Sequence, residues 1–117
     1  MRTEKEKMLA EGLYRAGDKE LRQNVKTGRH LTRLFNQTTE DDQEFRKELL
    51  KKLFKQTGDN LYIEPPFNCD YGSNTTIGEN FYANFDCVFL DVAPITIGKN
   101  VMFGPKVNLL TPGHPID

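Results

Sequence analysis

The residue best suited to chemistry in this 117-residue sequence is His114, in the segment LLTPGHPID at residues 109–117. Its neighbours Gly113 and Pro115 are typical of a turn, which would present the side chain beside a more rigid segment. An imidazole has an unperturbed pKa of about 6.5, so at neutral pH it can accept a proton from a reacting hydroxyl. Taken alone, the spacing fits a solvated turn residue at least as well, and both interpretations stay open at this point.

Composition excludes several classes of partner. Sixteen Lys and Arg against seventeen Asp and Glu give a formal charge of −1, so no overall field attracts nucleic acid or an anionic membrane. No run of about 18 apolar residues is present, and the start MRTEKEKMLAEG lacks the apolar core of a signal peptide. With two cysteines and no secretion signal, we expect a cytoplasmic protein with reduced thiols.

Residues 3–54 are predicted to form helices, because their apolar residues recur at helical spacing. Most charged residues also lie before Asp59, which indicates a change of architecture near that residue. A second helix is predicted to begin near Asp18, and Thr39 or Glu40 is predicted to cap a third. The third helix should present one apolar face made of Phe45, Leu49, Leu50, Leu53 and Phe54.

The second half shows an internal repeat instead. YGSN begins at Tyr71, IGEN at Ile77, IGKN at Ile97 and FGPK at Phe103, so two of the intervals are six residues and the middle one is three sixes plus two. Each six residues would supply one short strand and one turn, with the first and fifth side chains pointing inward. The inward pairs are Tyr71/Thr75, Ile77/Phe81, Ala83/Cys87, Ile97/Val101 and Phe103/Val107.

This period predicts a parallel β-helix with three strands and about 18 residues per coil. Cys69 and Cys87 are one such coil apart, so we expect them to stack on the same inner wall at the usual strand spacing of about 4.8 Å. Free cysteines are most often buried as small apolar residues, and we predict no metal at this pair.

The whole chain resembles the maltose and galactoside O-acetyltransferases, a family of hexapeptide-repeat acyltransferases. The resemblance is carried by EKEKM at residues 4–8, LYRAGD at 13–18, CDYG at 69–72, ANFDCVFLD at 83–91 and GHP at 113–115. It implies a mainly β fold, a left-handed parallel β-helix preceded by an N-terminal α-helical segment. Residues 1–58 would then cover the acceptor site, and residues 59–117 would form the first coils.

The resemblance also implies an activity, the transfer of acetyl from acetyl-CoA to a hydroxyl of a sugar such as maltose, glucose or a galactoside. In the family the histidine of the HP turn is the general base, and that motif falls on His114. General-base assistance of this kind is typically worth about 10²- to 10⁴-fold in rate.

Four further positions follow from the resemblance as predicted acceptor-binding residues. Asn84 matches a family asparagine that orients the acceptor or donates to the developing oxyanion, with an ordinary turn asparagine as the alternative. Asp70 and Asp91 match or neighbour positions that bind sugar hydroxyls, although solvated loop carboxylates fit nearly as well. Asp18, with Tyr14, lies in the segment that covers the acceptor pocket, where a helix-cap role is equally consistent.

The family assembly implied is a homotrimer with active sites between subunits, for which Phe85, Phe89 and Phe103 could supply apolar contact. The residues that bind acetyl-CoA are expected in further coils beyond the chain, since family members continue after the GHP turn. We therefore expect the chain to be the N-terminal part of an acetyltransferase. The alternative is a truncated, non-catalytic β-helical module or assembly partner.

Other enzyme classes fit less well. A carbonic anhydrase of the β-helical type needs three histidines around zinc, whereas the sequence contains only His30 and His114, so we predict no metal. Hexapeptide acyltransferases that act on serine or amino sugars share the repeat, but the helical entry segment favours the maltose and galactoside branch.

Overall fold

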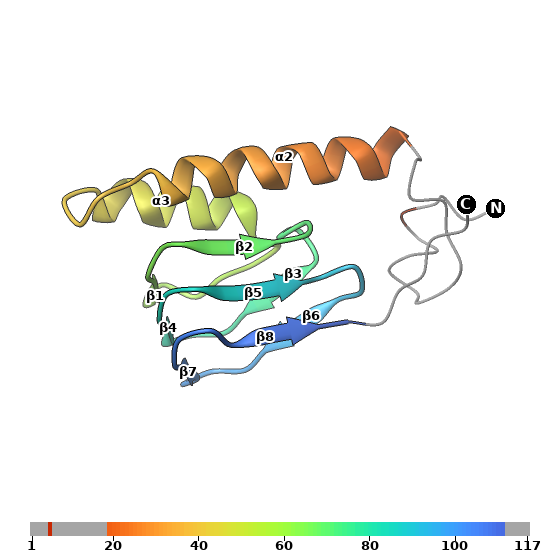
Figure 1. Cartoon of the computed structure of the whole chain (residues 1–117). Helices are drawn as coiled ribbons and strands as arrows, with labels where there is room; N and C mark the ends of the chain where they lie inside the picture. Colours follow the sequence, from red (N-terminus) through yellow and green to blue (C-terminus); the bar gives the residue numbers. More distant parts are fainter. Residues whose placement is uncertain (1–4, 6–18, 112–117) are drawn as a thin grey trace.

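The computed structural model describes Lys5 and residues 19–111, in which two helices lie across one end of a stack of short strands (Figure 1). The helices are α2 (Lys19–Asn36) and α3 (Gln43–Leu53). The strands are β1 (Leu61–Ile63), β2 (Phe67–Cys69), β3 (Thr75–Ile77), β4 (Phe81–Ala83), β5 (Cys87–Leu90), β6 (Ile95–Ile97), β7 (Met102–Phe103) and β8 (Asn108–Leu110).

Strands β1 to β5 each pair in parallel with the strand three places further along the chain. The three resulting sheets have the orders β1-β4-β7, β2-β5-β8 and β3-β6. Leu61 pairs with Phe81, and Phe67 pairs with Cys87. Each coil is therefore two residues longer than the hexapeptide period predicted, and the predicted coil length was wrong.

The two additional residues fall at one corner of every coil. Strands β1 and β2 begin six residues apart, as do β3 and β4, but β2 and β3 begin eight residues apart, and so do β5 and β6. We call residues 70–74, 91–94 and Thr111 the long corner. The corner that follows β1, β4 and β7, made of residues 64–66, 84–86 and 104–106, is called the short corner.

The longer coil changes the partners of the two cysteines. Cys87 pairs with Phe67 and is fully buried, whereas Cys69 pairs with Phe89 and is only partly buried. The predicted stacking of the cysteines on each other was wrong, because the interval between them falls two residues short of one coil. Their assignment as core residues with free thiols holds, since both pack in the same apolar cluster.

The inward pairs of the repeat form the core, as the six-residue spacing predicted. Seven of these side chains are buried, and Val101, Phe103 and Val107 are half-buried against the same cluster. Phe89 packs edge-on against Phe67, with ring centroids 4.9 Å apart. Phe89 has no exposed surface, so only Phe85 of the three phenylalanines proposed for a subunit contact is exposed.

Helix α3 closes the first end of the coil with Leu49, Leu50 and Leu53, and Phe54 follows them into the core. Phe45 was predicted on this face but is 46 % exposed, while Arg46 beside it is 5 % exposed. The buried stripe runs through 46, 49, 50 and 53, the i, i+3, i+4, i+7 pattern, and Phe45 lies one position off it.

The start of α3 also differs from the prediction. The residue before the helix is Asp42, and its Oδ2 accepts a hydrogen bond from the backbone N–H of Thr39 at 2.8 Å. Thr39 Oγ1 in turn accepts from the backbone N–H of Asp41. Thr39 therefore organises the turn that precedes the helix and does not cap it.

Helix α2 is held on the coil by polar contacts to the edge of β2 and by one close backbone approach. Asn36 Nδ2 donates to the Phe67 carbonyl at 2.9 Å, and the Phe67 N–H donates to Asn36 Oδ1 at 2.8 Å. At Gly28 an added Cβ would lie 2.5 Å from the Tyr71 carbonyl oxygen. Glycine has a low helix propensity, but at position 28 its lack of a side chain lets α2 approach the long corner.

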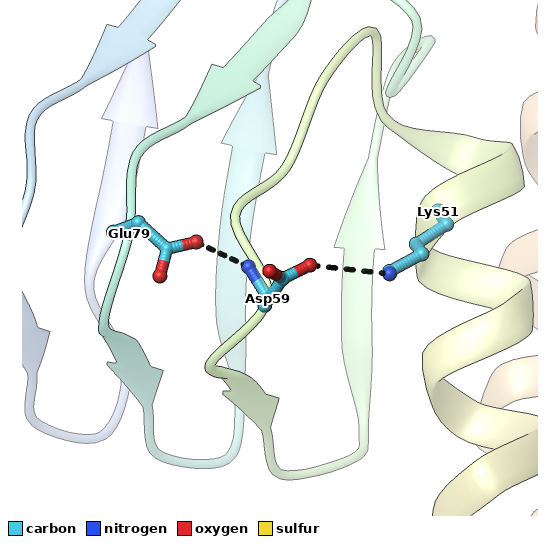
Figure 2. Close-up of polar contacts among 3 residues, drawn as sticks. All are labelled: Lys51, Asp59 and Glu79. Atoms are coloured by element: carbon cyan, nitrogen blue, oxygen red, sulfur yellow. Dashed lines mark hydrogen bonds and ion pairs between the residues drawn. The ribbon is translucent and has the colours of Figure 1, made fainter.

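The segment after α3 joins the coil before β1 begins. The Lys55 N–H donates to the Thr75 carbonyl, and the Ile77 N–H donates to the Gln56 carbonyl, so this segment pairs with β3. Beside it, Lys51 Nζ lies 3.8 Å from Asp59 Oδ1, and the Asp59 N–H donates to the Glu79 carboxylate (Figure 2). The Asp59 side chain is 97 % exposed, so this ion pair contributes little to stability.

Candidate functional site

The long corner is organised by the carboxylate of Asp91, which has no exposed surface. Its Oδ1 accepts from the Tyr71 and Gly72 N–H groups at 2.8 and 3.1 Å, and its Oδ2 accepts from Asn74 N–H and Thr75 Oγ1 at 3.2 and 2.9 Å. Burial raises the pKa of this carboxyl, and most of these hydrogen bonds oppose the rise. Both oxygens of Asp91 thus hold the backbone of the long corner, and its predicted contact with a sugar hydroxyl stays a prediction.

Two more residues of this corner were not singled out from the sequence. Asn74 Nδ2 donates to the Asp91 carbonyl at 2.8 Å. Thr111 Oγ1 donates to the Leu90 carbonyl at 2.7 Å and accepts from the Ala93 N–H at 2.9 Å. Tyr71, Asp91 and Thr111 follow one another at intervals of one true coil, so that coil length, had it been recognised, would have placed them at one corner.

Asp70 lies on the same corner and is half-buried. Burial raises the pKa of its carboxyl, the nearby Asp91 carboxylate raises it further, and the Arg29 guanidinium on α2 lowers it. A partly exposed carboxyl between a cation and a buried anion can accept hydrogen bonds from a ligand's hydroxyl groups. Asp70 thus suits the predicted acceptor contact better than Asp91 does.

Asn84 lies on the short corner, directly after β4. Its side-chain oxygen accepts from the Phe85 N–H at 2.8 Å, and its own N–H donates to the Phe103 carbonyl at 3.0 Å. Because the amide oxygen is occupied by the backbone, the NH₂ group is the end left to donate to a ligand.

The outer side of β4 adds an aromatic surface next to Asn84. The rings of Tyr62 and Tyr82 stack at 5.6 Å with an interplanar angle of 11°, and Met102 continues this ladder with 77 % of its surface exposed. The side chains of Asn60, Asn80 and Asn100 form a parallel hydrogen-bonded ladder on the same sheet. One true coil separates successive members of both ladders, which the shorter predicted coil did not reveal.

Of the predicted residues that the structure describes, Asp70 and Asp91 lie together and Asn84 lies apart from them. Asp70 and Asp91 lie on the long corner and Asn84 on the short corner, and β5, which separates the corners, alone spans about 10 Å. His114, Asp18 and Tyr14 lie outside the described residues. His114 follows Thr111 by three positions, so in sequence it comes next after the long corner.

Two further properties concern metal and membrane. Among residues 19–111 no group of three or more His, Cys, Asp and Glu is placed to hold a metal ion. Within the same part of the chain no helix has the length and apolar character needed to cross a bilayer.

The helical cover over the first coil is the feature that comparison with known proteins recognises. A family model described as the maltose acetyltransferase hexapeptide capping motif matches residues 7–58. A crystal structure of a maltose O-acetyltransferase from Clostridium difficile is 49 % identical and superimposes with a TM-score of 0.93 over 99 % of this chain and 62 % of that chain. This chain corresponds to the N-terminal part of the maltose and galactoside O-acetyltransferases.

Two more distant relatives also align with most of this chain. A galactoside acetyltransferase solved in complex with coenzyme A is 35 % identical, with a TM-score of 0.86 over 92 % of this chain and 54 % of that chain. Nodulation protein L of Rhizobium meliloti is 41 % identical over 116 residues, which are 99 % of this chain and 63 % of that protein. The chain spans about three fifths of the length of the curated relatives it matches first.

Proposed function

We propose that this chain is the acceptor-binding part of an acetyl-CoA dependent sugar O-acetyltransferase. The observation that carries the proposal is the helical cover of α2 and α3 on a three-sided coil, which superimposes on a maltose O-acetyltransferase at 49 % identity. The coenzyme A bound to the related galactoside enzyme supports acetyl-CoA as the donor. We further propose that the coils wind left-handed, with residues 1–58 as the cover and 59–117 as the coil.

In the proposed reaction His114 is the general base. The imidazole takes the proton of the sugar hydroxyl as that oxygen attacks the thioester carbonyl of acetyl-CoA, which forms a tetrahedral intermediate. As the carbon–sulfur bond breaks, the imidazolium returns the proton to the departing thiolate, which leaves the acetylated sugar and free CoA thiol. A sugar hydroxyl is almost fully protonated at neutral pH, so removal of its proton during the attack lowers the barrier.

Asn84 and Asp70 would bind the acceptor from two sides. The NH₂ group of Asn84 is the free end of its amide, since Phe85 holds the oxygen, and it would donate to the acceptor or to the developing oxyanion. The half-buried Asp70 carboxylate would accept from sugar hydroxyls, and Asp18 of the helical cover is proposed as a further acceptor contact. Asp91 is proposed to act through the backbone of the long corner, which it fixes.

Because one side of the coil separates Asn84 from Asp70, we propose that a complete site forms between neighbouring chains of a homotrimer. The short corner of one chain would then face the long corner of the next. Exposed apolar side chains gather near the short corner, namely Tyr82, Phe85 and Met102, and support a contact there. We propose the cytoplasm as the compartment, which agrees with the two free thiols.

The test is acetyl transfer from acetyl-CoA to maltose, glucose and a thiogalactoside, followed by release of free thiol, in the full-length context that supplies the further coils expected to bind the donor. The His114→Ala variant should lose about 10²-fold or more in rate, while its circular dichroism and its sedimentation behaviour stay those of the unaltered chain. A matched control is His30→Ala, an exposed histidine on α2 that should leave the rate unchanged.

Two outcomes would contradict the proposal. Equal rates for the two histidine variants would remove His114 from its role as the base. A chain that binds a sugar but releases no thiol with any acceptor would support the alternative, a non-catalytic module or assembly partner.

A further inference from the structure

A groove of about 450 Å³ lies between α2 and the outer edge of β2, and the proposed reaction does not use it. We call it the α2–β2 groove. Its volume falls in the range of about 300–1,000 Å³ that is usual for small-molecule sites. The side chains that give it chemical character are Arg29, Arg33, Gln37, Asn68 and Cys69.

Two polar residues of the groove are already occupied by the fold. Thr32 Oγ1 donates to the Gly28 carbonyl at 2.7 Å, and both polar atoms of the Asn36 amide bind the Phe67 backbone. The polar groups that remain for a ligand are the two guanidinium groups and the amides of Gln37 and Asn68, all on exposed side chains.

The edge of β2 adds backbone groups to this set. In a parallel strand, alternate residues direct their N–H and C=O to opposite edges. Phe67 directs both groups to Asn36, and Asp70 donates the other way, to Phe89, so Cys69 presents its N–H and C=O to the groove.

The charged side chains that line the groove are both positive. No acidic side chain lines it, and within the described part of the chain neither arginine forms an ion pair. Arg33 Nη2 contacts the exposed His30 Nδ1 at 3.3 Å, and Arg29 acts on Asp70 at the groove's end. Two cations at i and i+4 repel each other, and an anion bound between them would relieve the repulsion. The carbonyl end of α2 opposes an anion, so the guanidinium groups must supply the attraction.

We propose that the α2–β2 groove binds the oxyanion group, carboxylate or phosphate, of a sugar acid or sugar phosphate. Arginine suits both groups because its planar fork donates two parallel hydrogen bonds to them. The saccharide part of the inference rests on the proposed function, because Cys69 directly precedes Asp70 and a ligand in the groove would reach toward that carboxyl. The oxyanion part rests on the groove alone.

The experiment is an NMR titration of the ¹⁵N-labelled chain with glucose 6-phosphate, in the absence of acetyl-CoA. Saturable shifts are expected for the Cys69 amide and for the Nε–H signals of Arg29 and Arg33. Arg33→Gln should weaken the binding about tenfold, the loss expected for one charge-assisted hydrogen bond. Arg22→Gln is the matched control, since Arg22 is exposed on α2 but does not line the groove.

Titrations with inorganic phosphate and with glucose separate the two parts of the inference. The expected order is tightest binding for glucose 6-phosphate, weaker binding for phosphate and the weakest for glucose. Equal binding of phosphate and glucose 6-phosphate would overturn the saccharide assignment. Equal effects of Arg22→Gln and Arg33→Gln, or shifts spread over the lysines, would overturn the oxyanion site. Because no acetyl donor is present, these results stand whether or not the chain transfers acetyl.

Discussion

Within the described residues, the two ends of the stack of strands are built from similar repeats but differ in what covers them. At the first end, α2 and α3 cover Phe54, Phe67 and Phe89. The centroids of these three rings lie 4.9 to 6.4 Å apart. At the other end, the described residues leave a hollow of about 520 Å³. Its lining includes Ile95, Val101, Phe103, Leu109 and Leu110.

This difference shows what a hexapeptide strand can and cannot do. Each hexapeptide directs its first and fifth side chains inward, and its strand pairs with the neighbouring strands along the coil axis. It supplies nothing to close the core across that axis, so burial at an end depends on other elements. At the first end the leucines of α3 meet this need, and the neighbouring helix α2 is held on the coil by Asn36 and by the close approach at Gly28.

The largest predicted effect compares phenylalanines at the two ends. Phe67→Ala should lower the free energy of unfolding by about 3–5 kcal/mol, because the fully buried ring leaves a cavity under the helices. Phe103→Ala at the other end should cost about 1–2 kcal/mol, since the ring is half-exposed and its site opens to solvent. Urea unfolding followed by far-UV circular dichroism measures both. Equal losses would mean that the helices add no protection to the core.

The second prediction tests how the helical cover is attached. Gly28→Ala should cost about 2 kcal/mol, because the new Cβ collides with the Tyr71 carbonyl and outweighs a gain of about 1 kcal/mol in helix propensity. Gly98→Ala is the control near the other end, where an added Cβ meets nothing within 4 Å, and it should stay within about 0.5 kcal/mol. Stabilisation by Gly28→Ala would show that α2 does not approach the corner as described.

The third prediction concerns pH at the covered long corner. The folded-state pKa of Asp70 is raised, chiefly by burial, so between the unfolded pKa of about 3.9 and that raised value the folded chain binds more protons. The stability that Asp70 contributes is complete below the unfolded pKa and is lost as pH rises through the raised pKa.

The variant Asp70→Asn stays uncharged at every pH and therefore isolates this effect. The urea concentration at its unfolding midpoint should rise relative to that of the unaltered chain as pH rises from 4 to 7. A difference between the two midpoints that does not change with pH would contradict the raised pKa.

The smallest effect is expected at the ion pair of Figure 2. Asp59→Asn removes the contact with Lys51 but keeps the backbone N–H that donates to Glu79, so the stability should change by less than about 0.5 kcal/mol. Lys51→Met should behave alike. A loss above about 1 kcal/mol for either variant, measured at about 0.1 M salt, would show that the covered end depends on charge as well as on apolar burial.

Much of the fold was predictable from the sequence, and the errors in the coil have a common cause. The inward side chains of the repeat were identified correctly because strand alternation is a local property. The coil length, the pairing of the cysteines and the neighbours of Asp91 were missed, because the two-residue insertion was counted once and not once per coil. Phe45 was assigned to the buried face for another reason, since its position differs from the true stripe by one residue of helix rotation.

For the candidate site, the choice of residues and their arrangement in space must also be considered separately. Asn84, Asp70 and His114 were chosen from motifs of the family that the sequence resembles, and their roles stay predictions. The arrangement was not predictable, because the corner on which a residue falls depends on the register between coils. Arg29 beside Asp70 and the tyrosine ladder beside Asn84 have no motif, and only the folded chain brings them to the site.

The sequence by itself determined that short strands and turns alternate and that helices precede them, because both patterns are fixed by neighbouring residues. Only the tertiary structure decided the true length of a coil, the burial of Asp91 at a corner, and the placement of Asn84 and Asp70 on different sides. These depend on contacts between residues far apart in the chain, such as Asn74 with Asp91 and Asn36 with Phe67. No local pattern specifies such contacts until the chain is packed.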